Sequence, residues 1–189
     1  MIYPSDDVAL LQRRAALGDE RAYADLMRLS QDATYRLIVR YVFDRSEAYD
    51  LLQESYAAGW LAIRRYDPTR PFGPWLKRIA LNKCRDWGRR RLVRQAVNGV
   101  LGLETPEAHL AADPALGAES QLIERESSDR LAREIARLPA QLKEPLLLTA
   151  IEGLSQGEAA ALLGISTKAV ESRTYRARQR LLHRLGSSS

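Results

Sequence analysis

The sequence predicts an all-α protein made of two small helical domains joined by a flexible linker. Apolar residues form 46% of the 189-residue chain and recur at helical spacing, and no stretch shows the alternation of a half-buried strand. Glycine, proline and small residues with weak periodicity interrupt this pattern at 95–121. Basic charge is concentrated on both sides of that segment. We therefore predict one domain over 1–94, an acidic flexible linker over 95–121 and a second domain over 122–186.

Cap and turn residues divide the first domain into three predicted helices. Asp19 is a typical N-cap residue and begins a helix that runs to about Val42. Asp and Ser at 44–46 end this helix, so the second helix is predicted at about 47–66. Two closely spaced prolines at 67–71 exclude a regular helix there, so the third helix is predicted at about 74–94.

The third predicted helix carries a basic face. Residues 64–94 hold eleven basic and two acidic side chains, a net charge of +9. Arginines follow a nucleic-acid backbone, an aromatic ring stacks on bases and an amide reads a base edge, so this pattern favours single-stranded DNA. The polar face and the ring beside it consist of Arg78, Asn82, Arg85, Arg89 and Trp75. The alternative is that Trp75 and Phe72 simply belong to the core.

The second predicted helix carries an acidic face. Glu47, Asp50 and Glu54 share one side of it, with Gln53 beside them. An acidic face in a basic protein repels DNA, so we expect it to face solvent or a basic protein partner.

Composition argues against several other classes of protein. The only two histidines, His109 and His183, are isolated, and no phosphate-cradling glycine loop or nucleophile motif is present. We therefore expect no enzyme activity, cofactor, metal or small-molecule substrate. The net charge of +5 favours a polyanionic partner, and the single cysteine, Cys84, fits a reducing compartment. The start lacks a signal-peptide pattern and no apolar run approaches roughly 18 residues, so we expect a cytoplasmic protein without membrane insertion.

The second domain contains the pattern of a helix-turn-helix. Ser155 and Glu158 have the spacing of a capping box, Gly164 supplies a turn, and Ser166 caps the following helix. One side of that helix is predicted to be buried and consists of Val170, Thr174, Ala177 and Leu181. The other side holds residue types that reach phosphates and base edges: Lys168, Ser172, Tyr175, Arg176 and Gln179. The alternative is an ordinary helical hairpin with a solvated face.

Together these stretches resemble the extracytoplasmic-function (ECF) sigma factors, group IV of the sigma-70 family. Residues 45–91 resemble conserved region 2, and residues 138–181 resemble region 4. The shared motifs are an acidic helix, an Asp-Pro loop, a W-L-x-R-I-A-x-N stretch and a helix-turn-helix that ends in R-A-R. The resemblance implies a protein that binds core RNA polymerase, recognises the −10 and −35 elements of promoter DNA and helps to open the promoter.

The resemblance also implies roles for particular residues. The helix with Asp50, Gln53 and Glu54 would dock on the polymerase clamp. The 67–74 loop and the polar face of the third helix would capture the −10 element, and the helix from Thr167 would read the −35 element. Glu171 departs from the family, which often has a basic residue or another polar donor there. A carboxylate accepts from cytosine N4 but repels phosphates, so the −35 sequence stays open.

The family also implies a regulatory partner. An anti-sigma factor, commonly membrane-anchored, would insert helices between the two domains. The competing hypothesis is a stand-alone helix-turn-helix regulator whose first domain serves dimerisation or sensing. Such a regulator needs neither an acidic docking face nor a single-strand groove, so residues 45–91 distinguish the two hypotheses.

Overall fold

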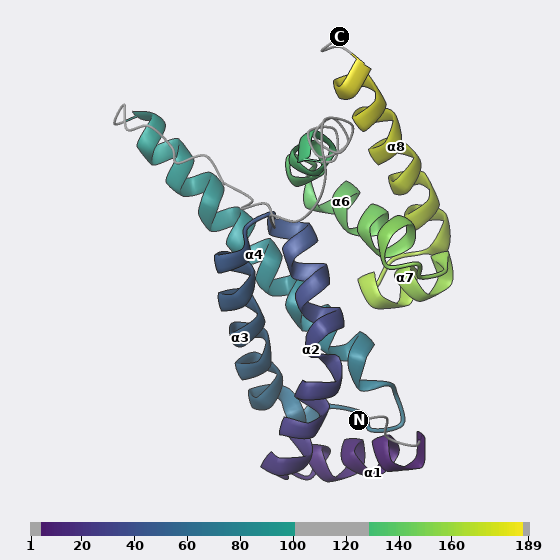
Figure 1. Cartoon of the computed structure of the whole chain (residues 1–189). Coiled ribbons are helices and arrows are strands. Elements are labelled where there is room, and N and C mark those ends of the chain that lie inside the picture. Colours follow the sequence, from purple (N-terminus) through teal and green to yellow (C-terminus); the bar gives the residue numbers. More distant parts are fainter. Residues whose placement is uncertain (1–4, 101–128, 187–189) are drawn as a thin grey trace, which may run out of the picture.

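The computed structural model describes residues 5–100 and 129–186, and all regular structure in these ranges is helical, which confirms the all-α fold. The helices form two lobes (Figure 1). The N-terminal lobe contains α1 (Ser5–Ala16), α2 (Glu20–Val42), α3 (Arg45–Ala62), the short 3₁₀ helix η1 (Ile63–Arg65) and α4 (Phe72–Val100). The C-terminal lobe contains a helical segment at 129–136, α6 (Ala140–Leu146), the π-helical turn η2 (Leu147–Ile151), α7 (Gln156–Leu163) and α8 (Thr167–Gly186).

The junctions of the N-terminal helices follow from cap residues. The Asp19 carboxylate accepts hydrogen bonds from the backbone N–H groups of Arg21 and Ala22, which confirms it as the N-cap of α2. Helix α2 ends at Val42 as predicted, and Phe43 follows in a left-handed conformation with φ of 55°. Asp44 then caps α3, and its carboxylate accepts from the backbone N–H of Glu47 at 3.0 Å.

Helix α4 is longer than predicted. It begins at Phe72 and continues to Val100, so the first six residues of the predicted linker are helical. The C-terminal part of α4 extends away from the body of the lobe (Figure 1), and the Leu92 and Val97 side chains there are exposed. The rest of the predicted linker, its acidic side chains and the predicted helix start near 122 lie outside the described residues.

Residues 1–18 carry no predicted element, yet the structure places α1 there. Leu11 and Ala15 are buried against α2, at the spacing of a helix face. The side-chain oxygen of Gln12 accepts hydrogen bonds from the Tyr66 hydroxyl at 2.6 Å and the Phe72 backbone N–H at 3.0 Å. Helix α1 therefore fixes both ends of the 67–71 loop and the start of α4.

The predicted helix-turn-helix is confirmed in its local geometry. The Ser155 hydroxyl accepts from the Glu158 backbone N–H, and the Glu158 carboxylate accepts from the Ser155 backbone N–H at 2.8 Å, which completes a capping box. Gly164 has φ of 68°, a value that glycine adopts without strain. The predicted inner face of α8 is buried: Val170, Thr174, Ala177 and Leu181.

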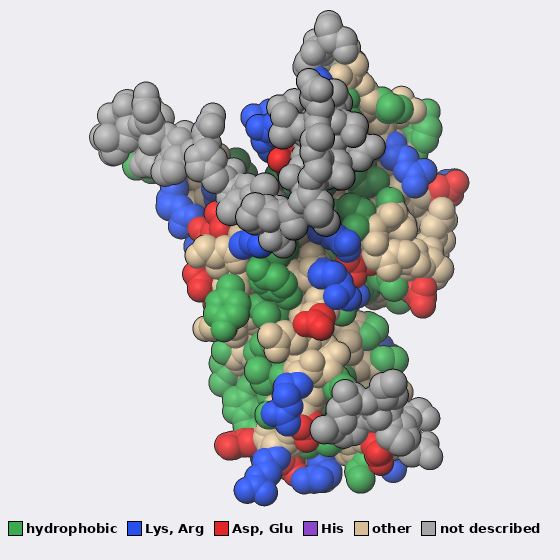
Figure 2. Space-filling model, in the orientation of Figure 1, with side chains coloured by type: hydrophobic (Ala, Val, Ile, Leu, Met, Phe, Trp, Pro, Cys, Tyr) green, Lys and Arg blue, Asp and Glu red, His purple; other side chains and the backbone are tan. Residues whose placement is uncertain are grey.

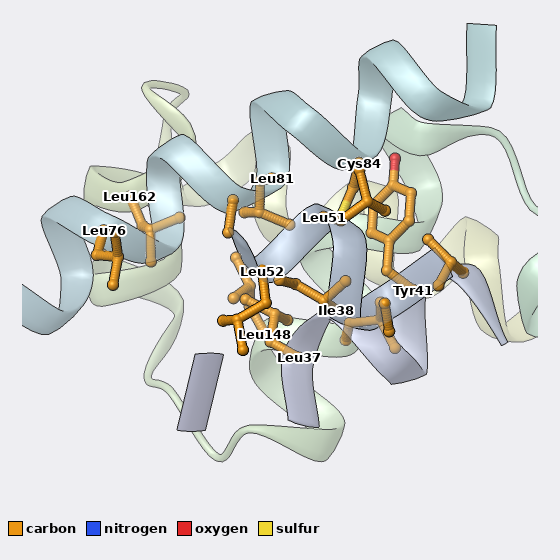
Figure 3. Packing of buried hydrophobic residues seen from close by; sticks show 14 of the residues in the cluster. Leu37, Ile38, Tyr41, Leu51, Leu52, Leu76, Leu81, Cys84, Leu148 and Leu162 are labelled. Carbon is orange, nitrogen blue, oxygen red and sulfur yellow. The ribbon is translucent and has the colours of Figure 1, made fainter. Parts of the chain in front are cut away.

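The two lobes share one continuous apolar core. Helix α7 packs against α4, and η2 packs against α2. Figure 3 draws Leu162 of α7 next to Leu76 of α4, and Leu148 of η2 next to Leu37 of α2. All four side chains are at least nine-tenths buried. In the structure, therefore, the lobes are packed against each other as well as connected through the chain.

Close packing inside the N-terminal lobe generates a test at Gly59. A Cβ atom at this position would lie 2.5 Å from the Tyr23 hydroxyl oxygen, which donates a buried hydrogen bond to the Tyr56 carbonyl at 2.7 Å. We expect Gly59→Ala to lower the free energy of unfolding by about 1–3 kcal/mol through overpacking. Urea denaturation followed by circular dichroism measures this change.

Gly88 on α4 is the matched control. A Cβ atom there would meet no heavy atom within 4 Å. Gly88→Ala should therefore raise the free energy of unfolding by about 0.5–1 kcal/mol, the usual gain for alanine in a helix. Equal effects of the two substitutions would contradict a specific role for Gly59 in helix packing.

Candidate DNA and polymerase interfaces

The outer face of α8 is open to solvent. Thr167 begins the helix, and the Ser166 hydroxyl accepts from the Ala169 backbone N–H at 3.2 Å, so the predicted cap is confirmed. All six predicted −35 residues lie on this helix, five of them exposed and Ser172 half-buried: Lys168, Glu171, Ser172, Tyr175, Arg176 and Gln179. Four of them line a groove that α8 forms with η2 and the start of α7: Lys168, Glu171, Ser172 and Tyr175. The Arg176 guanidinium donates to the Ser172 hydroxyl at 2.9 Å.

The predicted basic face of α4 is only partly open. Arg78, Asn82 and Arg89 are exposed, and Arg89 forms an ion pair with Asp86. Arg85 is half-buried, and its guanidinium donates to the Asn82 side-chain oxygen at 2.8 Å and to the Glu144 carboxylate at 2.6 Å. This face therefore already has two acidic ligands, Asp86 of the same helix and Glu144 of the C-terminal lobe.

Trp75 lies at the edge of an aromatic cluster. Its ring centroid is 4.8 Å from that of Tyr66 and 5.4 Å from that of Phe72. Phe72 is buried and also packs edge-on against Tyr23, so it belongs to the core, whereas Trp75 is half-buried. The exposed part of the Trp75 ring is the part that a base could reach.

The predicted acidic face on α3 is divided between α4 and solvent. The Glu47 carboxylate accepts from the Trp87 indole N–H at 2.7 Å. The Glu54 carboxylate lies 3.5 Å from the Lys83 ammonium and 3.9 Å from the Arg90 guanidinium. Asp50 and Gln53 are exposed. Gln53 also lies on the rim of a largely apolar groove between α2 and α3, which is lined by Glu20, Tyr23, Ala24, Met27, Tyr56, Ala57 and Trp60.

Two buried carboxylates of the C-terminal lobe contact basic side chains of the N-terminal lobe. The Glu152 side chain is 7% exposed, and its oxygens lie 2.8 Å from Arg40 Nη1 and 3.0 Å from Lys77 Nζ. The Glu144 side chain is 4% exposed and accepts from both Arg85 and the Tyr41 hydroxyl. Neither glutamate is among the predicted site residues. The available signal is that the two acids lie on either side of a largely apolar stretch, 145–151.

Burial shifts the pKa of two groups at this contact between the lobes. It lowers the pKa of Lys143 to about 8, and the ammonium donates to the Ala136 carbonyl at 2.6 Å and the Tyr41 carbonyl at 3.3 Å. Burial also raises the pKa of the Cys84 thiol to about 12. The thiol therefore stays protonated and is a poor nucleophile at neutral pH.

Figure 2 shows basic side chains scattered over both lobes on one face, with acidic side chains between them. Among the described residues, no cluster of three or more His, Cys, Asp or Glu side chains is placed to hold a metal ion. No helix within 5–100 or 129–186 is both long and apolar enough to span a membrane.

A helix-turn-helix in one lobe and a basic helix in the other are typical of a transcription factor. Comparison with known families makes this specific. Residues 26–93 match the family described as "Sigma-70 region 2", and residues 128–181 match "Sigma-70, region 4". The chain belongs to the sigma-70 family of RNA polymerase sigma factors, and its relatives place it in the ECF group.

The chain is similar to RNA polymerase sigma factor CnrH of Cupriavidus metallidurans, with 38% identity over 187 residues that cover 98% of each protein. It is also similar to the ECF RNA polymerase sigma factor SigW of Bacillus subtilis, with 31% identity over 172 residues, 89% of this chain and 91% of that protein. A solved structure of CnrH in complex with the cytosolic domain of CnrY matches with a TM-score of 0.66 and 31% identity. It covers 96% of this chain and 99% of that one. These findings confirm the predicted family and a role in promoter recognition.

The buried ammonium of Lys143 predicts a pH-dependent contribution to stability. Between the folded-state pKa of about 8 and the ordinary value of 10.5, the unfolded chain holds a proton that the folded chain has released. The free energy of unfolding of the wild type should therefore rise with pH in this window, relative to Lys143→Met. Urea denaturation of both proteins at about pH 7.5 and about pH 9.5 measures the difference. A difference that does not change with pH would contradict the low pKa of Lys143.

Proposed function

We propose that this sigma factor uses three separate surfaces: α3 for core RNA polymerase, the polar face of α4 for the −10 element and the outer face of α8 for the −35 element. The observation that carries the proposal is the exposed polar face of α8 on a capped helix-turn-helix, in the same chain as a second exposed basic helix. Two DNA surfaces in one chain fit two promoter elements.

On α8, residue type suggests different roles for the side chains of the outer face. Ser172 and Tyr175 would lie near base edges, whereas the cationic Lys168 and Arg176 would bind phosphates. Glu171 lines the groove beside α8, where its carboxylate would accept from a cytosine amino group.

On α4, Asn82 is the candidate reader of a −10 base. Its side chain is exposed and lies between Arg78 and Arg85, one helical turn away on either side. The arginines would hold the phosphates of the single strand, and the amide would then form hydrogen bonds to a base edge. The exposed part of the half-buried Trp75 ring would stack on a neighbouring base.

On α3, exposed Asp50 and Gln53 form the open part of the acidic face. The apolar groove beside Gln53 provides a surface for aliphatic side chains. This combination suits a basic helical element with some apolar residues, and we propose that the polymerase clamp supplies it.

The proposal includes a regulatory partner and a place of action. CnrH has been solved with the cytosolic domain of CnrY bound. By this likeness we propose that a cytosolic segment of an anti-sigma factor binds this chain, which would act in the cytoplasm without a cofactor or catalytic step of its own.

Reversing the charge of the acidic face tests polymerase binding. Asp50→Lys combined with Glu54→Lys should weaken the binding of core polymerase by more than about a hundredfold, because like charges at an interface cost several kcal/mol. Fluorescence anisotropy with labelled sigma factor and core polymerase measures the affinity, and circular dichroism checks the helix content.

The matched control places one reversed charge elsewhere on the same lobe. Asp32 is exposed on α2 and is not part of the acidic face, so Asp32→Lys should leave polymerase affinity within about twofold of the wild type. Unchanged affinity in the double variant would exclude the acidic face as the docking surface.

Asn82→Ala tests the −10 surface separately. The variant should form holoenzyme normally, but the lost amide should cost about 1–3 kcal/mol, on the order of ten- to a hundredfold, in promoter opening. Permanganate footprinting on duplex promoters measures opening, and pre-melted templates should retain the defect at the −10 base. Equal opening by the variant and the wild type would remove Asn82 from the site.

A further inference from the structure

At the contact between the lobes, two carboxylates of the C-terminal lobe form ion pairs with three basic side chains of the N-terminal lobe. Glu144 and Glu152 come from one helical stretch of the C-terminal lobe, α6 and η2 with the residue that follows. They contact Arg40 of α2 and Lys77 and Arg85 of α4. Each carboxylate is bound by arginine or lysine, the side chains that also bind the phosphates of nucleic acids.

The burial of these carboxylates makes the contact close to all-or-none. Their side chains are only 4% and 7% exposed, and a buried carboxylate without its cation carries an energetic penalty of several kcal/mol. The lobes can therefore either keep these ion pairs or separate far enough for water to reach both carboxylates. Partial loosening, with Glu144 buried and unpaired, is the least favourable arrangement.

The apolar part of the contact continues the core of each lobe. Leu148 and Leu162 of the C-terminal lobe lie against Leu37 and Leu76. Contacts of mixed polar and apolar character between domains are typical of those that open and close. The closed arrangement therefore combines this apolar contact with the ion pairs of Glu144 and Glu152.

The contact overlaps with the proposed −10 surface. Arg85 belongs to that surface, yet its guanidinium is bound to Glu144 and to the Asn82 side chain. The turn at Gly164 also lies close to this face, since a Cβ atom there would be 3.9 Å from Arg78 Nη2. A DNA strand that follows Arg78, Asn82 and Arg85 along α4 would therefore meet the C-terminal lobe.

We propose that the C-terminal lobe is an autoinhibitory cover, in which Glu144 occupies Arg85 of the −10 surface and Glu152 holds the cover in place through Arg40 and Lys77. The −10 surface then becomes available only when the lobes separate. This inference rests on the proposed function of α4 and adds a closed, inactive state of the free protein. The occupant of the basic face in that state is the chain itself.

The test uses the full-length chain with Glu144→Gln and Glu152→Gln combined. Small-angle X-ray scattering should show a larger radius of gyration than for the wild type. A fluorescein-labelled single-stranded oligonucleotide of mixed sequence, measured by anisotropy at low salt, should bind about tenfold more tightly. This gain is expected if about one wild-type molecule in ten is open, because apparent affinity scales with the competent fraction.

A charge-matched control distinguishes the effect of separating the lobes from the effect of the higher net positive charge on DNA binding. Glu134 pairs with Arg137 and Arg184 inside the C-terminal lobe, and Asp32 is exposed on α2. Glu134→Gln combined with Asp32→Asn removes the same two charges without touching the contact between the lobes. The control should keep the wild-type radius of gyration, and its DNA affinity should rise by no more than about twofold.

The remaining outcomes each overturn the proposal for a different reason. If the Glu144 and Glu152 variant stays compact, these carboxylates do not hold the lobes together. Arg78→Ala with Arg89→Ala, added to that variant, distinguishes two further failures. If the variant expands without a gain in DNA affinity, and the added substitutions weaken binding, α4 binds DNA but is not covered. If they have no effect on binding, the proposed −10 function of α4 itself is wrong.

Discussion

The inner side of α4 is buried over several turns, between α2 and α3 of its own lobe and α7 of the other. Leu76, Ala80 and Cys84 on this side are inaccessible to solvent. The same helix presents Arg78, Asn82 and Arg89 on its outer side. Because these side chains alternate along one rigid helix, core packing sets the positions of the polar groups. The location of the proposed DNA-binding face is therefore fixed by buried side chains a few residues away.

Ion pairs inside the molecule neutralise part of the positive charge that the basic composition suggests. The net charge of +9 over 64–94 implies a strongly attractive surface. In the folded chain, Lys83 and Arg90 lie near Glu54, while Lys77 and Arg85 contact glutamates of the other lobe. Much of the positive charge counted in the sequence is therefore neutralised within the protein. A count of charges along a sequence overestimates the field that a ligand meets, because it leaves out partners that only the fold brings near.

The features predicted well from the sequence are those encoded by neighbouring residues. The Asp19 cap, the capping box of Ser155 and Glu158, and the turn at Gly164 all depend on residues within a few positions of one another. Helix α1 carries the same kind of signal, an apolar spacing that includes Leu11, but it is short and lies in a polar context. It was therefore missed, as were the C-terminal extension of α4 and the short 3₁₀ helix η1.

The features missed at the candidate site depend on distant residues. The partners of Glu144 and Glu152 are separated from them by 59 to 112 positions. Helical periodicity indicates which side of a helix is buried, but it does not indicate which other helix covers it. The sequence pattern therefore placed Arg85 correctly on the polar side of α4 and could not show that a glutamate already binds it. The roles assigned to the −35, −10 and polymerase residues remain predictions for the same reason, since each depends on a molecule outside the chain.

The position of Cys84 has a consequence for how a cell could control this protein. It is the only cysteine in the chain, it is fully buried, and its thiol is held in the protonated form. Peroxides and disulfides react with exposed thiolates, so a burst of oxidant would leave this sulfur unmodified while the N-terminal lobe stays folded. Cys84 therefore does not provide an oxidant-sensitive switch while the N-terminal lobe stays folded.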